Sequence, residues 1–129
     1  MLLVEDDEGT RESLVEILSE AGASVRASAS VAEALEALSE FRPDVLLSDL
    51  AMPGRDGFSL IAELRARPPE HGGDIPAAAV SALAGVEDQR RALAAGFQMH
   101  IPKPVDIDGL LSAVARLATL RRTGRPASQ

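Results

Sequence analysis

The chain has 129 residues, of which 46% are hydrophobic and 26% are charged, and its formal net charge at pH 7 is −7. A chain of this length forms about one domain with a buried core. The absence of cysteine excludes disulfide bonds and thiolate metal sites. Residues 119–129 carry three arginines and no acidic residue, so residues 1–118 carry a net charge of −10. Because this charge repels nucleic acids and anionic membranes, we expect no direct binding to nucleic acid.

The start of the chain and its apolar runs bear on its location. No apolar run approaches the roughly 20 residues that a membrane-spanning helix requires. The residues after Met1 are apolar, without the basic segment that opens a secretory signal peptide. The sequence therefore predicts a cytoplasmic domain without membrane insertion.

Four short apolar segments and a weaker one around Val25 predict five β-strands. They lie at residues 2–4, about 24–28, 45–47, 77–80 and 99–101. Runs that are apolar on both faces are typical of interior parallel strands that helices cover. Because a proline has no N–H group to donate to a strand ladder, Pro102 predicts that the fifth strand lies at an edge of the sheet.

Helical patterns alternate with these strands. Apolar residues recur with helical spacing at residues 12–21, about 31–40, 60–64, 86–95 and 110–118. Ser30 and Glu33 form the sequence of a capping box before the second helix. Gly22 and Gly96 mark the ends of the first and fourth helices, and Asp106 or Asp108 caps the last one.

This alternation predicts an α/β fold with a doubly wound, five-stranded parallel sheet. The predicted strand order is 2-1-3-4-5, in which strands 1 and 3 are neighbours at the point where the order reverses. We assign residues 1–118 to this domain. Residues 119–129 have no apolar stripe, and we interpret them as a flexible basic tail or linker.

Polar residues follow four of the strands at their carboxyl ends. Asp6 and Asp7 follow strand 1, Asp49 follows strand 3, and Ser81 and Lys103 follow strands 4 and 5. Each of them alone has an ordinary explanation as a loop, cap or solvated side chain. The carboxyl ends of parallel strands meet at one edge of a sheet, however, and α/β folds bind ligands there. We therefore predict that these side chains form one site.

The residue types at this edge favour phosphoryl chemistry. Three close carboxylates need a positive counter-charge to remain ionised, and Mg²⁺ prefers a few such oxygen ligands beside water and phosphate. Ser81 offers a hydroxyl donor and Lys103 a point charge to the oxygens of a phosphoryl group. Phosphoryl transfer requires mainly positioning and charge neutralisation, and Asp49 is the natural nucleophile.

Four ordered segments resemble the response-regulator receiver domain of two-component signalling. They are residues 3–8 (LVEDDE), 49–53 (DLAMP) with Gly57, 81–82 (SA) and 103–104 (KP). The resemblance covers about residues 1–118 and implies the flavodoxin-like receiver fold. The stretch at residues 96–100 is most similar to receivers of hybrid histidine kinases, which leaves the architecture of the parent protein open.

The resemblance implies a magnesium-dependent phosphorelay function. Asp49 would accept a phosphoryl group from a histidine kinase or a histidine phosphotransfer domain and become an aspartyl phosphate. Ser81 and Lys103 would bind the phosphoryl oxygens. The implied ligands of Mg²⁺ are Asp6, Asp7, Asp49 and the backbone carbonyl of Ala51.

The resemblance also implies a conformational switch. Ser81 and His100 would be its moving residues, with His100 at a position where the family commonly has Tyr or Phe. The switch would change the face formed by the fourth helix, the fifth strand and the fifth helix. The bond between Lys103 and Pro104 would be a cis peptide. Such a domain is a phosphoacceptor that signals and not a turnover enzyme.

Two other classes of protein use similar residues. An aspartate-nucleophile phosphatase also uses Asp, Mg²⁺, Ser and Lys, but that class has a second Asp two residues after the nucleophile, where this chain has Ala51. A flavin- or nucleotide-binding module would have a Gly- or Ser/Thr-rich loop after strand 1, where this chain has acidic residues. The cognate kinase, the output and the oligomeric state stay open.

Overall fold

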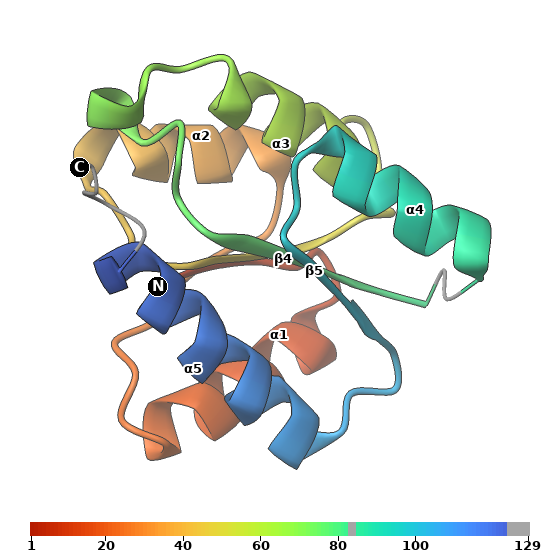
Figure 1. Ribbon diagram of the computed structural model, residues 1–129. Helices are drawn as coiled ribbons and strands as arrows, with labels where there is room; N and C mark the ends of the chain where they lie inside the picture. Colours follow the sequence, from red (N-terminus) through yellow and green to blue (C-terminus); the bar gives the residue numbers. More distant parts are fainter. Residues whose placement is uncertain (83–84, 124–129) are drawn as a thin grey trace.

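A computed structural model describes residues 1–82 and 85–123, with side chains as far as Leu120. Five strands alternate with five α-helices in this part of the chain (Figure 1). The strands are β1 (Leu2–Val4), β2 (Arg26–Ser28), β3 (Leu46–Asp49), β4 (Ala77–Ser81) and β5 (Met99–Pro102). The helices are α1 (Glu8–Glu20), α2 (Val31–Glu40), α3 (Gly57–Arg65), the short 3-10 helix η1 (Pro69–His71), α4 (Val86–Ala95) and α5 (Ile107–Thr123).

The strands form one parallel sheet in the order β2-β1-β3-β4-β5, which confirms the predicted order. Helices α1 and α5 cover one face, and α2, α3 and α4 cover the other (Figure 1). Alternate residues of β1 point to the two faces of the sheet. Leu2 and Val4 pack with α2 and α3, while Leu3 packs with α1 and α5. Strands β1, β3 and β4 are thus buried on both faces, as their apolar runs predict, whereas β2 and β5 are partly exposed.

Helix α1 begins at Glu8, earlier than the predicted start near residue 12. Asp7 is its N-cap, and the Asp7 carboxylate accepts hydrogen bonds from the backbone N–H of Thr10 at 2.9 Å and from the Thr10 hydroxyl at 2.7 Å. A carboxylate in this position satisfies free N–H groups of the first turn and interacts favourably with the helix dipole. The acidic segment after β1 is therefore partly a helix start.

Other helix ends follow the sequence closely. Ser30 accepts a hydrogen bond from the Glu33 N–H at 3.2 Å, and the Glu33 carboxylate accepts one from the Ala29 N–H at 3.1 Å, so the predicted capping signal is present. Helix α4 has the predicted bounds, and Gly96 after it has a φ angle of 124°. Of the two candidates for the last cap, Asp106 is the one that accepts from the Gly109 N–H, at 2.8 Å.

Strand β5 lies at the edge of the sheet, as Pro102 predicts. The carbonyl of Ser81 at the end of β4 accepts a hydrogen bond from the Lys103 N–H at 2.9 Å, just beyond Pro102. The peptide bond between Lys103 and Pro104 is cis, as the resemblance implies. The hydrogen bond to Ser81 holds Lys103 at the carboxyl end of the sheet.

Helix α5 continues beyond the predicted domain boundary at residue 118, to Thr123. The Thr119 hydroxyl donates to the Ala115 carbonyl at 3.0 Å, so residue 119 belongs to the helix and not to a tail. The rest of the predicted tail, residues 124–129, lies outside the described residues. Among the described helices, none combines the length and the apolar character needed to cross a bilayer.

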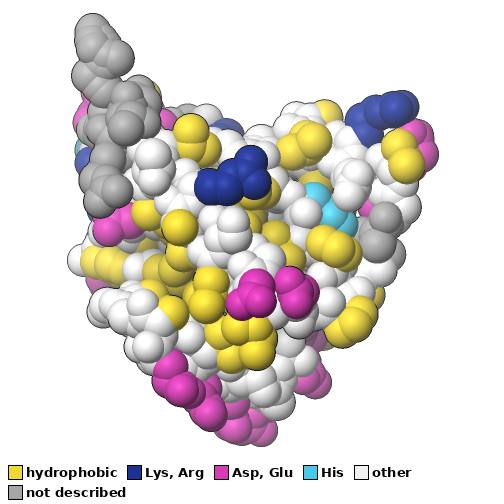
Figure 2. Space-filling view, turned by 60° about the horizontal axis from the view of Figure 1, so that its bottom comes forward, with side chains coloured by type: hydrophobic (Ala, Val, Ile, Leu, Met, Phe, Trp, Pro, Cys, Tyr) yellow, Lys and Arg dark blue, Asp and Glu magenta, His cyan; other side chains and the backbone are white. Residues whose placement is uncertain are grey.

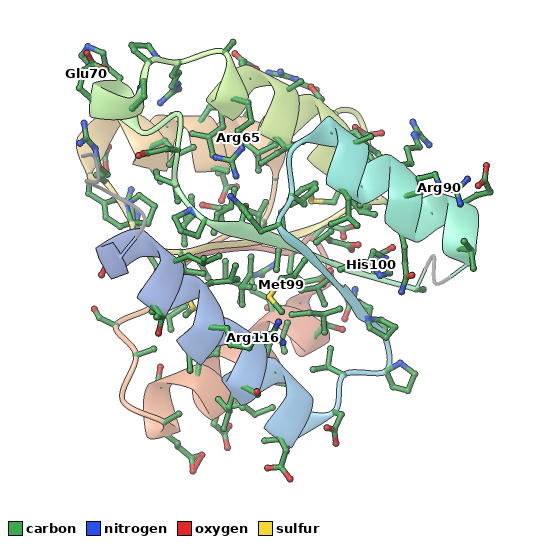
Figure 3. The ribbon with its side chains drawn as sticks, viewed as in Figure 1. Arg65, Glu70, Arg90, Met99, His100 and Arg116 are labelled. Carbon is green, nitrogen blue, oxygen red and sulfur yellow. The ribbon has the colours of Figure 1, made fainter. Side chains whose placement is uncertain are left out.

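A half-buried arginine of α3 ties this helix to the turn between α4 and β5. The Arg65 guanidinium donates to the Gly96 carbonyl at 3.0 Å, to the Gly73 carbonyl at 2.9 Å and to the Gln98 side chain at 3.0 Å (Figure 3). Burial lowers the pKa of Arg65, and the charge of Asp74 opposes this shift. The three acceptors belong to two separate loops, so Arg65 fixes both against α3.

Candidate functional site

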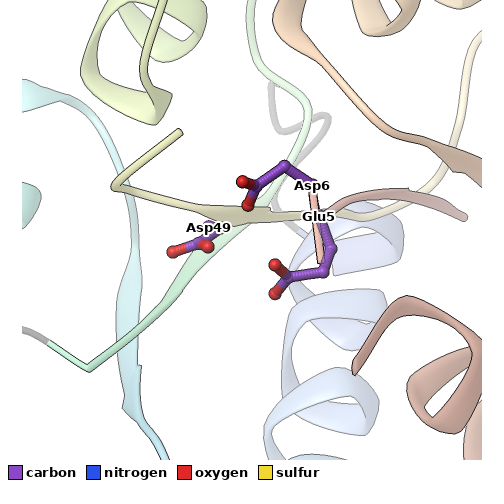
Figure 4. A group of neighbouring side chains, drawn as sticks. All are labelled: Glu5, Asp6 and Asp49. Atoms are coloured by element: carbon purple, nitrogen blue, oxygen red, sulfur yellow. The ribbon is translucent and has the colours of Figure 1, made fainter. Parts of the chain in front are cut away.

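Three carboxylates meet at the carboxyl end of the central strands (Figure 4). Glu5 and Asp6 follow β1, and Asp49 ends β3, which is the neighbour of β1 in the sheet. One carboxylate oxygen from each of the three residues lies within 4.8 Å of the other two. The topology thus brings together acids that are more than forty positions apart in the sequence.

Lys103 supplies the positive charge of this cluster. Its Nζ atom lies 2.7 Å from Oε1 of Glu5 and 3.3 Å from Oδ2 of Asp49. Glu5 is 1% exposed and Asp49 is 7% exposed, whereas Asp6 is open to solvent. Burial by itself lowers the pKa of Lys103, but the hydrogen bond to Glu5 and the charges of both carboxylates raise it, and the net pKa lies above its usual value. Lys103 is therefore a fixed cation at neutral pH.

The backbone around Asp49 is tightly packed. The Ala51 N–H donates to Oδ1 of Asp49 at 3.3 Å, and the Gly57 N–H donates to the Leu50 carbonyl at 2.9 Å. A Cβ atom at Gly57 would lie 2.2 Å from the Asp49 carbonyl oxygen, well inside van der Waals contact. Only glycine fits there, because the start of α3 passes directly against the strand end that carries Asp49.

The Asp7 carboxylate is not one of the three that meet in this cluster, although the Asp7 backbone N–H donates to Oε2 of Glu5 at 3.2 Å. The Asp7 carboxylate caps α1, and the hydrogen bonds from Thr10 lower its pKa. The place expected for Asp7 beside Asp6 and Asp49 is taken by Glu5. The geometry therefore favours Glu5 over Asp7 as the third carboxylate of the site.

Glu5 was not among the residues predicted for the site. The alternation of side chains along a strand could have indicated it. Leu3 faces the layer of α1 and α5, so Glu5, two residues later, is expected on the same side, and Glu5 is buried. Arg11 of α1 was also missed, and its guanidinium donates to the Glu5 carbonyl at 2.9 Å and the Asp6 carbonyl at 3.4 Å. Arg11 lies one helical turn after the N-cap of α1, and this position could have predicted that its side chain lies near the end of β1.

Ser81 and His100 lie on the two strands beyond Asp49. Ser81 is buried at the end of β4, one residue past Val80, the register partner of Asp49. His100 pairs with Ala79 on β5 and is half-buried. Both ring nitrogens of His100 are buried, and neither has a hydrogen-bond partner among residues 1–82 and 85–120. A buried polar atom without a partner is costly, which makes this imidazole a poor fit for a static core position.

The cluster suits a hard divalent cation. Its donors are carboxylate oxygens, and three carboxylates with one ammonium leave two negative charges to neutralise. Oxygen ligands of this number and charge are those that Mg²⁺ takes when it keeps part of its water shell. Asp6, after β1, and Asp49, at the end of β3, are the carboxylates that could face such an ion, while Glu5 is engaged by Lys103.

The comparisons with known proteins agree with this geometry. The family model of the response regulator receiver domain matches residues 1–115. An uncharacterized 14.6 kDa protein from the sodA1 3' region of Leptolyngbya boryana is 42% identical over 106 residues, which cover 82% of this chain and 79% of that protein. Response regulator MprA of Mycobacterium leprae is 37% identical over 123 residues, which cover 95% of this chain and 51% of MprA.

Solved structures show the same likeness. The receiver domain of a signal transduction histidine kinase from Syntrophus aciditrophicus has a TM-score of 0.82 and 35% identity, covering 92% of this chain and 88% of that one. The receiver domain of the Francisella response regulator 1452 has a TM-score of 0.83 and 28% identity, covering 92% and 94%. The chain belongs to the family of response regulator receiver domains, which are signalling domains of two-component systems. It spans about half the length of the MprA regulators that it matches.

Proposed function

We propose that this domain is the phosphoacceptor of a two-component phosphorelay and that Asp49 carries the phosphoryl group. The observation that supports this most directly is the setting of Asp49. Its carboxylate ends a central strand, is nearly buried, and lies 3.3 Å from the Lys103 ammonium beside two further acids. A nucleophile held in one place beside a fixed cation is what phosphoryl transfer requires.

The transfer itself balances on the residues present. A carboxylate oxygen of Asp49 forms a bond to phosphorus while the bond from phosphorus to the donor's imidazole nitrogen breaks. The electron pair of that bond leaves with the imidazole, and Asp49 becomes a mixed anhydride. Lys103, already within reach of Oδ2, remains as a counter-charge for the phosphoryl oxygens.

Asp6, Asp49 and the backbone carbonyl of Ala51 are the groups that we expect to hold Mg²⁺. When bound, the ion would neutralise the negative charge that the acids and the phosphoryl group bring together. Because so few protein ligands bind it directly, we expect weak affinity, with a dissociation constant on the order of 1 mM. Glu5 supports the site by holding Lys103 at 2.7 Å.

The phosphodonor is a histidine kinase or a histidine phosphotransfer domain, and it must approach the carboxyl edge of the sheet. A groove of about 550 Å³ opens there between α1 and the loop after β5. Its lining includes Thr10, Leu14, Ile17, Lys103 and Val105. Since Lys103 belongs to both the groove and the site, a donor helix in this groove brings its phosphohistidine next to Asp49.

The negative net charge of the domain favours such a protein partner over nucleic acid. We expect the parent protein to hold this domain in the cytoplasm. The kinase-attached receiver among the similar structures supports a hybrid histidine kinase as that parent.

The experiment is intact-mass analysis after incubation with acetyl phosphate and Mg²⁺. We expect wild type to gain one phosphoryl group and Asp49→Asn to gain none, with unchanged far-UV circular dichroism. Uptake by the Asn variant would contradict the assignment of Asp49. Sustained, multiple-turnover hydrolysis of phosphate monoesters would instead favour the phosphatase class.

We further propose that phosphorylation is read through Ser81 and His100. Their strands lead from the site to the face formed by α4, β5 and α5, where a groove of about 340 Å³ includes Met99, His100 and Arg116. Figure 2 shows hydrophobic side chains gathered in a hollow beside a histidine on this side of the molecule. The ring nitrogens of His100 are buried and have no hydrogen-bond partner in the described part of the chain. We therefore expect the ring to change position when Ser81 moves.

Two-dimensional NMR with and without a beryllofluoride mimic of the phosphoryl group tests this switch. We expect changes at His100 and along residues 86–118 as well as around Asp49. Changes confined to the surroundings of Asp49 would contradict it.

A further inference from the structure

A cleft lies at the amino ends of the strands, at the opposite end of the sheet from Asp49. It has a volume of about 350 Å³ and is formed by the end of α2 and the segment around η1. These two segments lead into β3 and β4, whereas Asp49 and Ser81 end those strands. The cleft therefore shares no residue with the phosphorylation site, and the proposed function does not use it.

The cleft carries positive charge in a chain that is acidic overall. Its charge comes from Arg42 and Arg67, which line it. Neither arginine forms an ion pair with any described side chain. The one carboxylate in the lining, Glu40, lies 2.6 Å from the guanidinium of Arg26 and is neutralised by it.

Asp74, in the segment between η1 and β4, interacts with Arg65. Two further negative groups near the cleft do not cancel its charge. The carboxyl end of α2 contributes about half an elementary negative charge, less than the two guanidinium groups supply. Glu70 lies at the outer end of η1, away from the sheet (Figure 3). Two arginines that line one cavity, with no ion-pair partner among the described residues, favour an anion there. The planar guanidinium matches the oxygens of a phosphate group in pairs.

The lining also includes Ser39 and three apolar side chains, one of which is aromatic. Leu38, Phe41 and Ile75 contribute side chains, of which Ile75 is buried and Phe41 half-buried. The Arg26 guanidinium lies 5.4 Å from the centre of the Phe41 ring. A ligand with a flat apolar body could stack on this ring while its anionic group reaches Arg42 and Arg67. The volume suits a small molecule and is too small for a macromolecular segment of any length.

We infer that this cleft binds a small phosphorylated ligand with a flat ring, of the nucleoside monophosphate class. Its phosphate group lies between Arg42 and Arg67, and its ring packs on Phe41. The domain thus has a ligand site at the end of the sheet remote from Asp49.

NMR titration with AMP at physiological salt tests the inference, with adenosine and inorganic phosphate as separate ligands. We expect AMP to perturb amides of residues 38–42 and 67–75 at low millimolar concentration or below, and to bind at least tenfold more tightly than either part. The double variant Arg42→Gln/Arg67→Gln should weaken AMP binding at least tenfold. Phe41→Leu should weaken AMP but leave inorganic phosphate unchanged.

Two matched variants separate this site from other effects. Arg90→Gln removes an arginine of α4 whose side chain is 73% exposed, and it should leave AMP affinity unchanged. Asp49→Asn should also leave it unchanged, so failure of the phosphoacceptor proposal would not affect this result. The absence of any AMP-dependent shift, equal binding of adenosine, or AMP binding by the double variant within threefold of wild type would each overturn the inference.

Discussion

Glu5 illustrates how one side chain sets the character of the site. A carboxylate that is 1% exposed needs a partner, and the Lys103 ammonium at 2.7 Å is that partner. The pair also fixes Lys103 near Asp49, so the cation that the phosphoryl group would meet is already oriented. Asp6, by contrast, remains exposed and is free to bind an ion from solvent.

The first prediction compares Asp6→Asn with Asp7→Asn. We expect Asp6→Asn to weaken Mg²⁺ binding at least tenfold, because it removes a charged ligand from the cluster. Asp7→Asn should change the affinity less than threefold, since the Asp7 carboxylate is engaged by Thr10 and Asn is also a good N-cap. NMR titration with MgCl₂ measures both constants. An equal loss of affinity in Asp7→Asn would restore Asp7 as a ligand.

The second prediction concerns Gly57. An alanine there would place its Cβ atom 2.2 Å from the Asp49 carbonyl oxygen, so the start of α3 has to move. We expect Gly57→Ala to lower the free energy of unfolding by about 1–3 kcal/mol and to slow phosphorylation. Gly9→Ala is the control, because its Cβ atom would make only an ordinary 3.7 Å contact in a helix that favours alanine. Urea unfolding followed by circular dichroism compares them, and equal stability of the two variants would refute the packing argument.

At the scale of elements, the helices are held to the sheet unequally. Ala92 is the buried residue of α4, whereas α3 buries Leu60, Ile61 and Leu64. The position of α4 therefore depends on polar contacts as well. The Arg91 guanidinium lies 4.0 Å from the centre of the Phe58 ring, and Arg65 binds the carbonyl of Gly96 at the end of α4.

The third prediction follows from these contacts. Arg65→Ala leaves the carbonyls of Gly73 and Gly96 without their donor, and we expect a loss of about 2–3 kcal/mol in the free energy of unfolding. Arg90→Ala removes an exposed ion pair with Glu87 and should change the free energy of unfolding by less than about 0.5 kcal/mol. Urea unfolding distinguishes the two variants. A loss of similar size in both would mean that the Arg65 contacts contribute little.

The elements were largely predictable from the sequence, and the details of the site were not. Strand and helix periods are local patterns, so all five strands and the bounds of α4 follow from them. The strand order was predicted from the doubly wound arrangement that their alternation indicates. The pairing of Glu5 with Lys103 joins residues 98 positions apart, and no local pattern encodes it. The N-cap role of Asp7 was hidden for a different reason, because four consecutive acids fit a solvated loop as well as a helix start. The predicted roles of Ser81, His100 and Mg²⁺ stay predictions.

For the whole molecule, the acid cluster predicts that Mg²⁺ stabilises the fold. A ligand that binds only the folded state at ten times its dissociation constant contributes about 1.4 kcal/mol. We expect MgCl₂ to raise the melting temperature of wild type, and NaCl at equal ionic strength to raise it less. In metal-free buffer Asp6→Asn should melt above wild type, because one of three crowded carboxylates is gone. The chain has no Trp or Tyr, so calorimetry is the suitable measurement. A lower melting temperature of Asp6→Asn without metal would contradict the repulsion argument.

The two edges of the sheet have a consequence for how this molecule meets other proteins. An exposed strand edge invites a further strand and, with it, aggregation. Here β2 is three residues long, and β5 is four residues long and ends in Pro102, which has no N–H to offer (Figure 1). Neither edge is a good template for another chain. Recognition of this domain therefore has to proceed through side chains on helices and loops, which leaves it free to bind and release partners without becoming part of their sheets.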